Sequence, residues 1–308
     1  MISLPSLLNW FHLFVIIIDS DDMRRIFMCL AICLLLGSCG EKHQPEDIPQ
    51  IVVEGWIESD GYPVVMLTTT VSIGEKAKDW NSLKDNILRW AKVSISDGVH
   101  EEILTGRMDN SYFPPYIYTT SRMQGESGKT YTLKVEYGGR TVTAQTTIPD
   151  PVPLKWIKVM PSNLSSHADI IAGLEDDSSQ KDYYKFFVKV MHEDSVYVPS
   201  FMGLINDEIL KDCVNEIVVH RGVSQIFGSE VTATSFDDDA EVIVKFCTLD
   251  EKTYEYWEDY EDIVSLSQNP FFPVTRKIRS NICGGLGYWA GYGSMKYVIS
   301  IADSLGVK

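Results

Sequence analysis

Short runs of alternating apolar and polar residues fill positions 51–148, and many of their members are β-branched or aromatic. Turn residues such as Asp97-Gly98 and Gly138-Gly139 separate the runs. The runs are 51–57, 63–70, 91–96, 101–105, 116–118, 130–137 and 141–148. About seven strands within about 100 residues are typical of a sandwich that buries two apolar faces. The pattern therefore predicts an immunoglobulin-like or fibronectin-like β-sandwich over residues 50–149.

Three alternate prolines, Pro149, Pro151 and Pro153, follow this region. They predict a domain boundary, because proline cannot donate a hydrogen bond within a central strand. Strand patterns resume beyond the prolines, at 154–160, 170–175, 183–191, 217–220 and 241–247. Residues 150–308 are therefore predicted to form a second antiparallel β domain, and the fold class of the whole chain is mostly β.

The apolar period changes after the last of these strands. In residues 250–267 the apolar side chains fall at helical spacing, and acidic side chains occupy most of the remaining positions. The apolar members are Tyr256, Trp257, Tyr260, Ile263 and Val264. This spacing predicts one amphipathic helix that packs on the second β domain.

The amino-terminal region contains two apolar stretches, 4–18 and 26–36, each too short to span a bilayer comfortably. The second stretch follows the basic pair Arg24-Arg25 and leads into Leu36-Gly37-Ser38-Cys39. This arrangement resembles the lipobox of bacterial lipoproteins. A membrane hairpin made of both stretches, or a secretory signal without lipidation, are the alternatives.

The lipobox resemblance implies a processing scheme. Residues 23–38 would be the signal peptide, Cys39 the lipidated first residue of the mature protein, and residues 39–49 a polar tether. Residues 1–22 are then interpreted as a misassigned start. The resemblance places the protein at the outer membrane, lipid-anchored and facing either the periplasm or the cell surface.

Composition and charge narrow the classes of partner. The chain is 44% hydrophobic and 23% charged, as expected of a globular protein. Lys and Arg number 27 against 43 Asp and Glu, so the formal net charge is −16 at pH 7. Such a charge repels nucleic acid, and no nucleic-acid partner is expected.

Cysteine usage gives no redox or zinc motif. Beyond the signal region the cysteines are Cys213, Cys247 and Cys283, without C-x-x-C spacing. Three cysteines allow at most one disulfide, and at least one is predicted to be a buried free thiol. Which of them pair, if any, is left open by the sequence.

Several segments resemble one lipoprotein family, catalogued as domain of unknown function 4249. The resemblance lies in Val52–Ile57 and Gly128–Leu133 in the first half, and in Thr253–Trp257, Asn269–Phe272 and Ser280–Tyr292 near the end. It implies a Bacteroidota cell-envelope protein whose gene lies near those of TonB-dependent outer-membrane transporters. The family has no established catalytic residues, so the resemblance supplies none.

Catalytic and cofactor motifs are absent or incomplete. Residues 285–290 fit G-x-G-x-x-A as a string, but no βαβ unit fits around them, so we interpret them as a glycine-rich turn that lets Tyr288 and Trp289 pack at a sheet edge. The histidines lack metal-ligand spacing. The acidic runs 175–177 and 237–239 lack EF-hand spacing and are interpreted as solvated turns. We predict no cofactor, no metal site, no catalytic residue and no enzymatic activity.

Aromatic clusters are the candidate partner-binding sites, because exposed aromatic side chains lose much solvent on docking. The residues are Tyr112, Tyr116, Tyr118, Phe271, Phe272, Tyr288 and Trp289. The alternative for each is core packing or a folded-back loop.

Three functions remain in different classes. The favoured hypothesis is a lipid-anchored binding or accessory module for a TonB-dependent transporter, because the two β domains contain no catalytic cluster. The second is an envelope structural or adhesion module. The third is a hydrolase with an unrecognised carboxylate site around Asp237–Glu241, which a deep pocket with perturbed carboxylates would favour.

Overall fold

The computed structural model of this protein describes residues 49–70, 85–175, 181–210, 213–222, 234–267 and 278–306. Pro49–Lys308 form one compact unit. The predicted signal peptide and Cys39 lie outside the described residues, as do Phe271 and Phe272. Within the described part the mostly β prediction is confirmed, since three sheets make up most of it.

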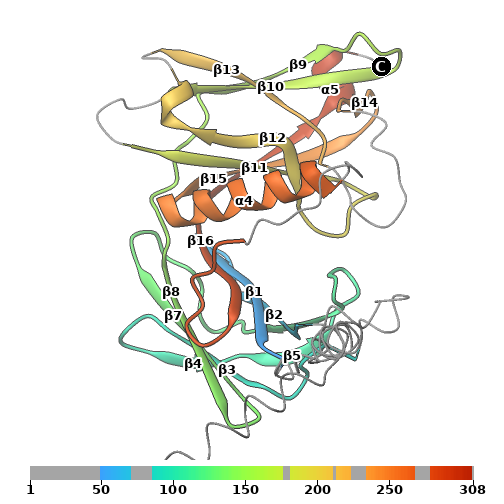
Figure 1. Ribbon diagram of the computed structural model, residues 1–308. Helices are drawn as coiled ribbons and strands as arrows, with labels where there is room; N and C mark the ends of the chain where they lie inside the picture. The colour runs from blue at the N-terminus through green and yellow to red at the C-terminus, as the bar shows by residue number, and fades with distance from the viewer. Residues whose placement is uncertain are drawn as a thin grey trace, which may run out of the picture. The chain divides into compact units, whose positions relative to one another are not determined.

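The largest sheet has eight strands and draws on both ends of the chain (Figure 1). In spatial order the strands are β12 (Val198–Asn206), β11 (Tyr183–Val190), β15 (Glu241–Leu249), β16 (Leu286–Ser300), β1 (Ile51–Glu58), β2 (Val64–Thr69), β6 (Tyr116–Thr119) and β5 (Thr105–Met108). β1 and β16 pair in parallel, with Val53 opposite Gly287 and Glu58 opposite Tyr292. The other pairs of this sheet are antiparallel.

Two four-stranded sheets cover parts of the large sheet. One has the order β4 (Glu101–Ile103), β3 (Lys92–Ser96), β7 (Thr130–Tyr137) and β8 (Arg140–Thr147). The other contains β13 (Val214–Val219), β10 (His167–Glu175) and β14 (Phe236–Asp237), with β9 (Trp156–Pro161) also paired to β10. A 3₁₀ turn, η1 (Asp207–Ile209), follows β12, and a short helix, α5 (Ile301–Leu305), follows β16.

Side chains of β16 alternate between the two faces of the sheet and contribute to three hydrophobic cores. The odd-numbered Trp289 belongs to the first core, with side chains of β1, β3 and β7. The odd-numbered Ile299 belongs to the second core, with side chains of β10 and β15. The even-numbered Tyr288, Ala290 and Tyr292 join a third core under the helix. One strand therefore organises both β regions of the compact unit.

The helix α4 (Glu251–Ser267) confirms the predicted amphipathic helix at 250–267. It packs against β11, β12 and β16, so Figure 1 shows it lying across the large sheet. Its Trp257 is buried in the third core. Asp250 caps the first turn, where the backbone N–H of Thr253 donates to Asp250 Oδ1 at 2.7 Å.

The glycine-rich segment 285–290 enters a central strand directly after Gly285, and Tyr288 and Trp289 lie within that strand and not at the predicted sheet edge. Gly287 has φ +102°, and a Cβ there would overlap the carbonyl oxygen of Val53 on the paired strand. Gly291 and Gly293 approach the backbones of Thr147 and Pro149 closely in the same way. Glycine stands in β16 because neighbouring backbones leave no room for a side chain.

The predicted boundary at 149–153 falls between two cores but does not interrupt the sheet. The core that contains Trp289 draws mainly on residues before the prolines, and the core that contains Phe246 lies after them. The large sheet joins strands from both sides through the β1–β16 pair. The division of the chain into two domains therefore stays a prediction, within a region that forms one compact unit.

Candidate functional site

A cavity of about 570 Å³ lies between one face of the large sheet and α4. Strands β1, β2, β6, β11, β15 and β16 supply its floor, and Tyr256, Trp257 and Tyr260 of α4 line its other side. The rest of the lining consists of Tyr62, Arg107 of β5, Tyr112, Phe113, Ser195, Val196, Tyr197 and Pro199. The volume falls within the range of small-molecule sites, about 300–1,000 Å³.

The alternation of side chains along β1 explains how the sequence forms this floor of the cavity. Ile51, Val53 and Ile57 point into the core, whereas Glu54, Trp56 and Glu58 line the cavity. A strand that alternates between aliphatic residues and charged or aromatic residues places every polar group of the run on the cavity side. The alternation thus separates the folding face of β1 from its candidate binding face.

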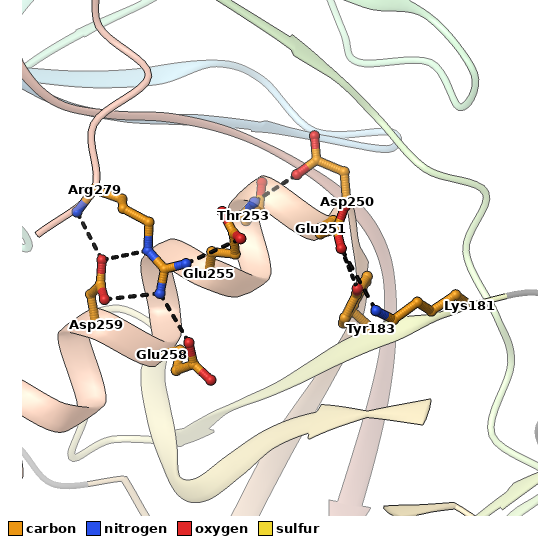
Figure 2. A network of polar contacts seen from close by, with 9 residues as sticks. All are labelled: Lys181, Tyr183, Asp250, Glu251, Thr253, Glu255, Glu258, Asp259 and Arg279. Atoms are coloured by element: carbon orange, nitrogen blue, oxygen red, sulfur yellow. Dashed lines mark hydrogen bonds and ion pairs between the residues drawn. The ribbon is translucent and has the colours of Figure 1, made fainter. Parts of the chain in front are cut away.

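Arg279 fixes the helix to the chain that leads into β16 (Figure 2). Its Nε–H donates to Asp259 Oδ2 at 2.7 Å and its Nη2 donates to Asp259 Oδ1 at 2.9 Å. The same guanidinium bonds Glu258 at 2.9 Å and pairs with Glu255 at 3.1 Å. Planar, bidentate pairing of this kind is the strong form of an ion pair.

Hydrogen bonds and ion pairs also connect α4 to the strand β11 of the sheet and the residue before it. Lys185 of β11, whose side chain is fully buried, donates to Glu261. Near the start of the helix the hydroxyl of Tyr183 donates to Glu251 at 3.0 Å, and Figure 2 shows Lys181 beside the same carboxylate. Polar contacts on two sides of the helix hold the aromatic side of the cavity in place.

Aromatic rings dominate the helix side of the cavity. Tyr256 stacks on Tyr288 with ring centroids 4.4 Å apart, and Trp257 meets Tyr260 edge to face at 5.2 Å. The indole N–H of Trp257 donates to the hydroxyl of Tyr292 at 3.1 Å. Burial raises the pKa of the Tyr256, Tyr288 and Tyr292 hydroxyls, so these groups stay neutral near pH 7.

One end of the cavity contains a compensated charge cluster around Glu58. Its carboxylate accepts from Lys245 Nζ at 2.9 Å and from Lys296 Nζ at 2.7 Å. Lys245 also lies 4.5 Å from the ring centroid of Tyr197 and 4.9 Å from that of Phe187. Burial alone would raise the pKa of Glu58, but the two lysines together outweigh it and lower that pKa.

The other end contains Glu54. Glu54 keeps part of its surface exposed, and its side chain lines the cavity among closely packed protein atoms. Desolvation raises the pKa of Glu54 to about 7. Burial and, after it, the charge of Glu54 raise the pKa of Tyr256 and Tyr260, which line the same cavity.

Two of the predicted partner-binding residues, Tyr112 and Tyr288, line the cavity. The alternative of core packing holds for Tyr118 and Trp289, which are buried in the first core with 2% and 0% of their surface exposed, and Tyr288 is buried in the third core. Tyr116 is half-buried, and its hydroxyl donates to the backbone carbonyl of Arg89 at 3.0 Å. Partner binding by any of these residues stays a prediction.

Sequence reasoning missed Glu54, Glu58 and Lys245 as site residues. The available signal was the charged and aromatic alternate face of β1, which contrasts with its aliphatic face. The lysine partners were not accessible to such reasoning, because Lys245 and Lys296 lie 187 and 238 residues from Glu58. Only the folded sheet brings them to the same carboxylate.

The other candidate chemistry lies elsewhere. Among the described residues no group of three His, Cys, Asp or Glu side chains is placed to hold a metal ion. Cys247 is a buried free thiol, as predicted for at least one cysteine, and Cys213 and Cys283 are exposed and also free. Asp237 lies 3.3 Å from the Nε2 of His167 on β10, outside the cavity lining.

Comparison with protein families decides the relationship suggested by the sequence. Residues 42–297 match the family described as Domain of unknown function (DUF4249). The chain belongs to this family. A comparison with curated proteins gives no match. In the described residues, no helix combines the length and apolar character needed to cross a membrane.

Proposed function

We propose that this DUF4249 chain is a non-catalytic binding module that takes a small organic ligand into the cavity between the large sheet and α4. The observation that carries the proposal is the aromatic lining of a cavity of about 570 Å³, interrupted by a few charged groups. Apolar walls with few polar groups are the usual composition of small-molecule sites. The rigid sheet and the ion-paired helix preorganise the site for binding.

The placement of the two cavity glutamates favours binding over hydrolysis. Glu54 and Glu58 stand four residues apart on one strand, about 13 Å at a rise of about 3.3 Å per residue. Paired carboxylates that hydrolyse glycosides flank the scissile bond, whereas these two rise from one face of a single strand. Glu58 is also occupied by two lysines, which leaves it ionised and unsuited to proton transfer.

The cellular role that fits such a module is accessory to a TonB-dependent transporter. This part of the proposal rests on the lipobox-like segment at Cys39 and on what the family resemblance implies, which together support a location at the outer membrane. A lipid anchor confines the module to the membrane of its transporter, and a weak interface then suffices because the effective concentration is high.

Ligand binding in the cavity is tested with 2-phenylethanol as a neutral aromatic probe, by calorimetry on the full chain in lipid nanodiscs. Ala290→Phe fills the cavity from β16, and we expect it to abolish binding that wild type shows. Val298→Phe, on the same strand but 75% exposed, is the matched control and should bind as wild type does. Equal binding by both variants would overturn the cavity as the binding site.

The accessory role is tested in cells. Cys39→Ala should release the protein from the membrane fraction and abolish labelling by a clickable fatty acid. Crosslinking in the native membrane with the wild-type lipoprotein as bait should recover a TonB-dependent transporter. If crosslinking recovers none and gene deletion leaves uptake by the neighbouring transporter unchanged, the envelope structural or adhesion role replaces the accessory role.

A further inference from the structure

The carboxylate of Glu54 enters the cavity without a partner from the described chain. No hydrogen bond or ion pair reaches it from the residues that the structure describes, although every other acidic or basic group of the cavity lining has one. Glu58 is bonded to Lys245, Lys189 Nζ donates to the carbonyl of Ser195 at 3.0 Å, and Arg107 pairs with Asp109. Within the described part of the chain, Glu54 is therefore the one charged group of the lining without an opposite charge or a hydrogen-bond donor beside it.

Aromatic side chains share the cavity with this carboxylate. Tyr288 lies opposite Glu54 on the paired strand β16 and stacks on Tyr256 of α4, and Tyr260 of the same helix also lines the cavity. Aromatic ring faces attract cations through their quadrupole, and a carboxylate adds a charge-assisted hydrogen bond or an ion pair. Rings and a free carboxylate in one cavity form the combination that recognises an organic ammonium group.

We propose that the Glu54 end of the cavity binds the ammonium group of an organic cation, with the apolar remainder of the ligand lying along the aromatic wall. The inference rests on the proposed function, since it names the class of ligand for the same cavity. The net charge of −16 also favours approach of a cation over an anion.

Binding of a cation should depend on pH through Glu54. The charged groups that line the cavity with it are Glu58 of β1, Lys245 of β15, Lys189 of β11 and Arg107 of β5. The titratable hydroxyls of the lining are those of Tyr256 and Tyr260 of α4, Tyr288 and Tyr292 of β16, Tyr62, Tyr112 and Tyr197. Burial raises the pKa of Tyr256 and Tyr260, and the lysine contacts lower the pKa of Glu58. Because burial raises the pKa of Glu54 to about 7, its ionised fraction grows across neutral pH and affinity for a cation grows with it.

The experiment compares 2-phenylethylammonium with 2-phenylethanol, which has the same aromatic part and no charge, by calorimetry on the full chain in nanodiscs. At pH 8 we expect the ammonium probe to bind wild type about tenfold more tightly than the alcohol. Glu54→Gln should remove that preference, and Glu101→Gln, an exposed carboxylate of β4, should keep it. Between pH 6 and pH 8 the wild-type affinity for the ammonium probe should rise about tenfold, with no such rise in Glu54→Gln.

The outcomes separate this inference from the proposed function. If the alcohol binds in a way that Ala290→Phe abolishes, but the ammonium probe shows no preference in wild type, the cavity binds ligands and the cation assignment is wrong. The assignment also fails if Glu54→Gln keeps the preference, or if methyl glucoside, a neutral polyol, binds more tightly than the ammonium probe. If neither phenylethyl probe binds, both the proposed function and the inference are overturned.

Discussion

The two ends of the cavity differ in how a glutamate of the same strand face is compensated. Glu58 is bonded to Lys245 and Lys296, and the pKa of its carboxyl is lowered. Glu54, four residues earlier, has no such partner among the described residues, and desolvation raises its pKa to about 7. The two residues share their type, their strand and the face of that strand, so the difference in pKa arises from the neighbouring strands. Compensation suits Glu58 to holding the sheet together, whereas Glu54 is suited to meeting a ligand.

The largest expected effect comes from removing the charge of the compensated end. Glu58→Gln leaves Lys245, whose side chain is 6% exposed, without its carboxylate, and unfolding free energy should fall by about 3–5 kcal/mol. Urea denaturation at pH 7 measures this, and Glu101→Gln should stay within about 0.5 kcal/mol of wild type. Because the folded pKa of Glu58 is lowered, its contribution is present above pH 4.5 and is lost as pH falls through the folded pKa. The difference between wild type and Glu58→Gln should therefore shrink in acid.

A smaller effect is expected at the helix that covers the Glu54 end. Arg279→Ala removes the bidentate bonds to Asp259, a buried carboxylate, and should lower the unfolding free energy by about 2 kcal/mol. Hydrogen exchange should accelerate in α4 and remain unchanged at Lys245 in β15, because the loss is local to the helix. Equal acceleration at both places would show that the two ends are not independent.

The smallest effect on stability is expected at the uncompensated end. For a carboxyl whose pKa is raised on folding, stability is fully present below the unfolded pKa near 4.5 and declines as pH rises to about 7. Glu54→Gln removes this decline, so the unfolding free energy of the variant should rise relative to that of wild type between pH 5 and pH 8. Allowing for screening by cavity solvent, the gain is on the order of 1 kcal/mol. Denaturation at both pH values measures it, and a loss at pH 8 would mean that Glu54 has a stabilising partner.

Hydrophobic patterns in the sequence correctly predicted the strands and the helix that short segments determine by themselves. The run 130–137 coincides with β7, and the predicted helix 250–267 differs from α4 by one residue. Alternating apolar positions and a helical period determine such segments whatever their neighbours are. The lipidation site, the tether and the partners have no structural test in the described residues and stay predictions.

Long-range contacts explain what the patterns did not predict. The three glycines of β16, Gly287, Gly291 and Gly293, contradict a strand by composition, and their reason is a backbone contact with distant segments. β12 was also missed as a strand. Trp289 was expected at a surface because its glycine-rich flank resembles a turn, but the strand carries it into the core. The lysine partners of Glu58 could not be predicted either, because they are distant from it in the sequence.

The parallel pairing of β1 with β16 has a consequence for folding kinetics. Ser59 and Ser294 exchange hydrogen bonds across 235 residues, at the end of the β1–β16 ladder. During synthesis β1 emerges before every other described strand, while its parallel neighbour emerges after them all. Closing so long a loop costs entropy before its contacts are formed, which makes topologies of this kind slow to fold. The nascent chain consequently exposes the unpaired edge of β1 until β16 has been synthesised. During that interval the edge can pair with other chains, and a chaperone that covers it would prevent aggregation.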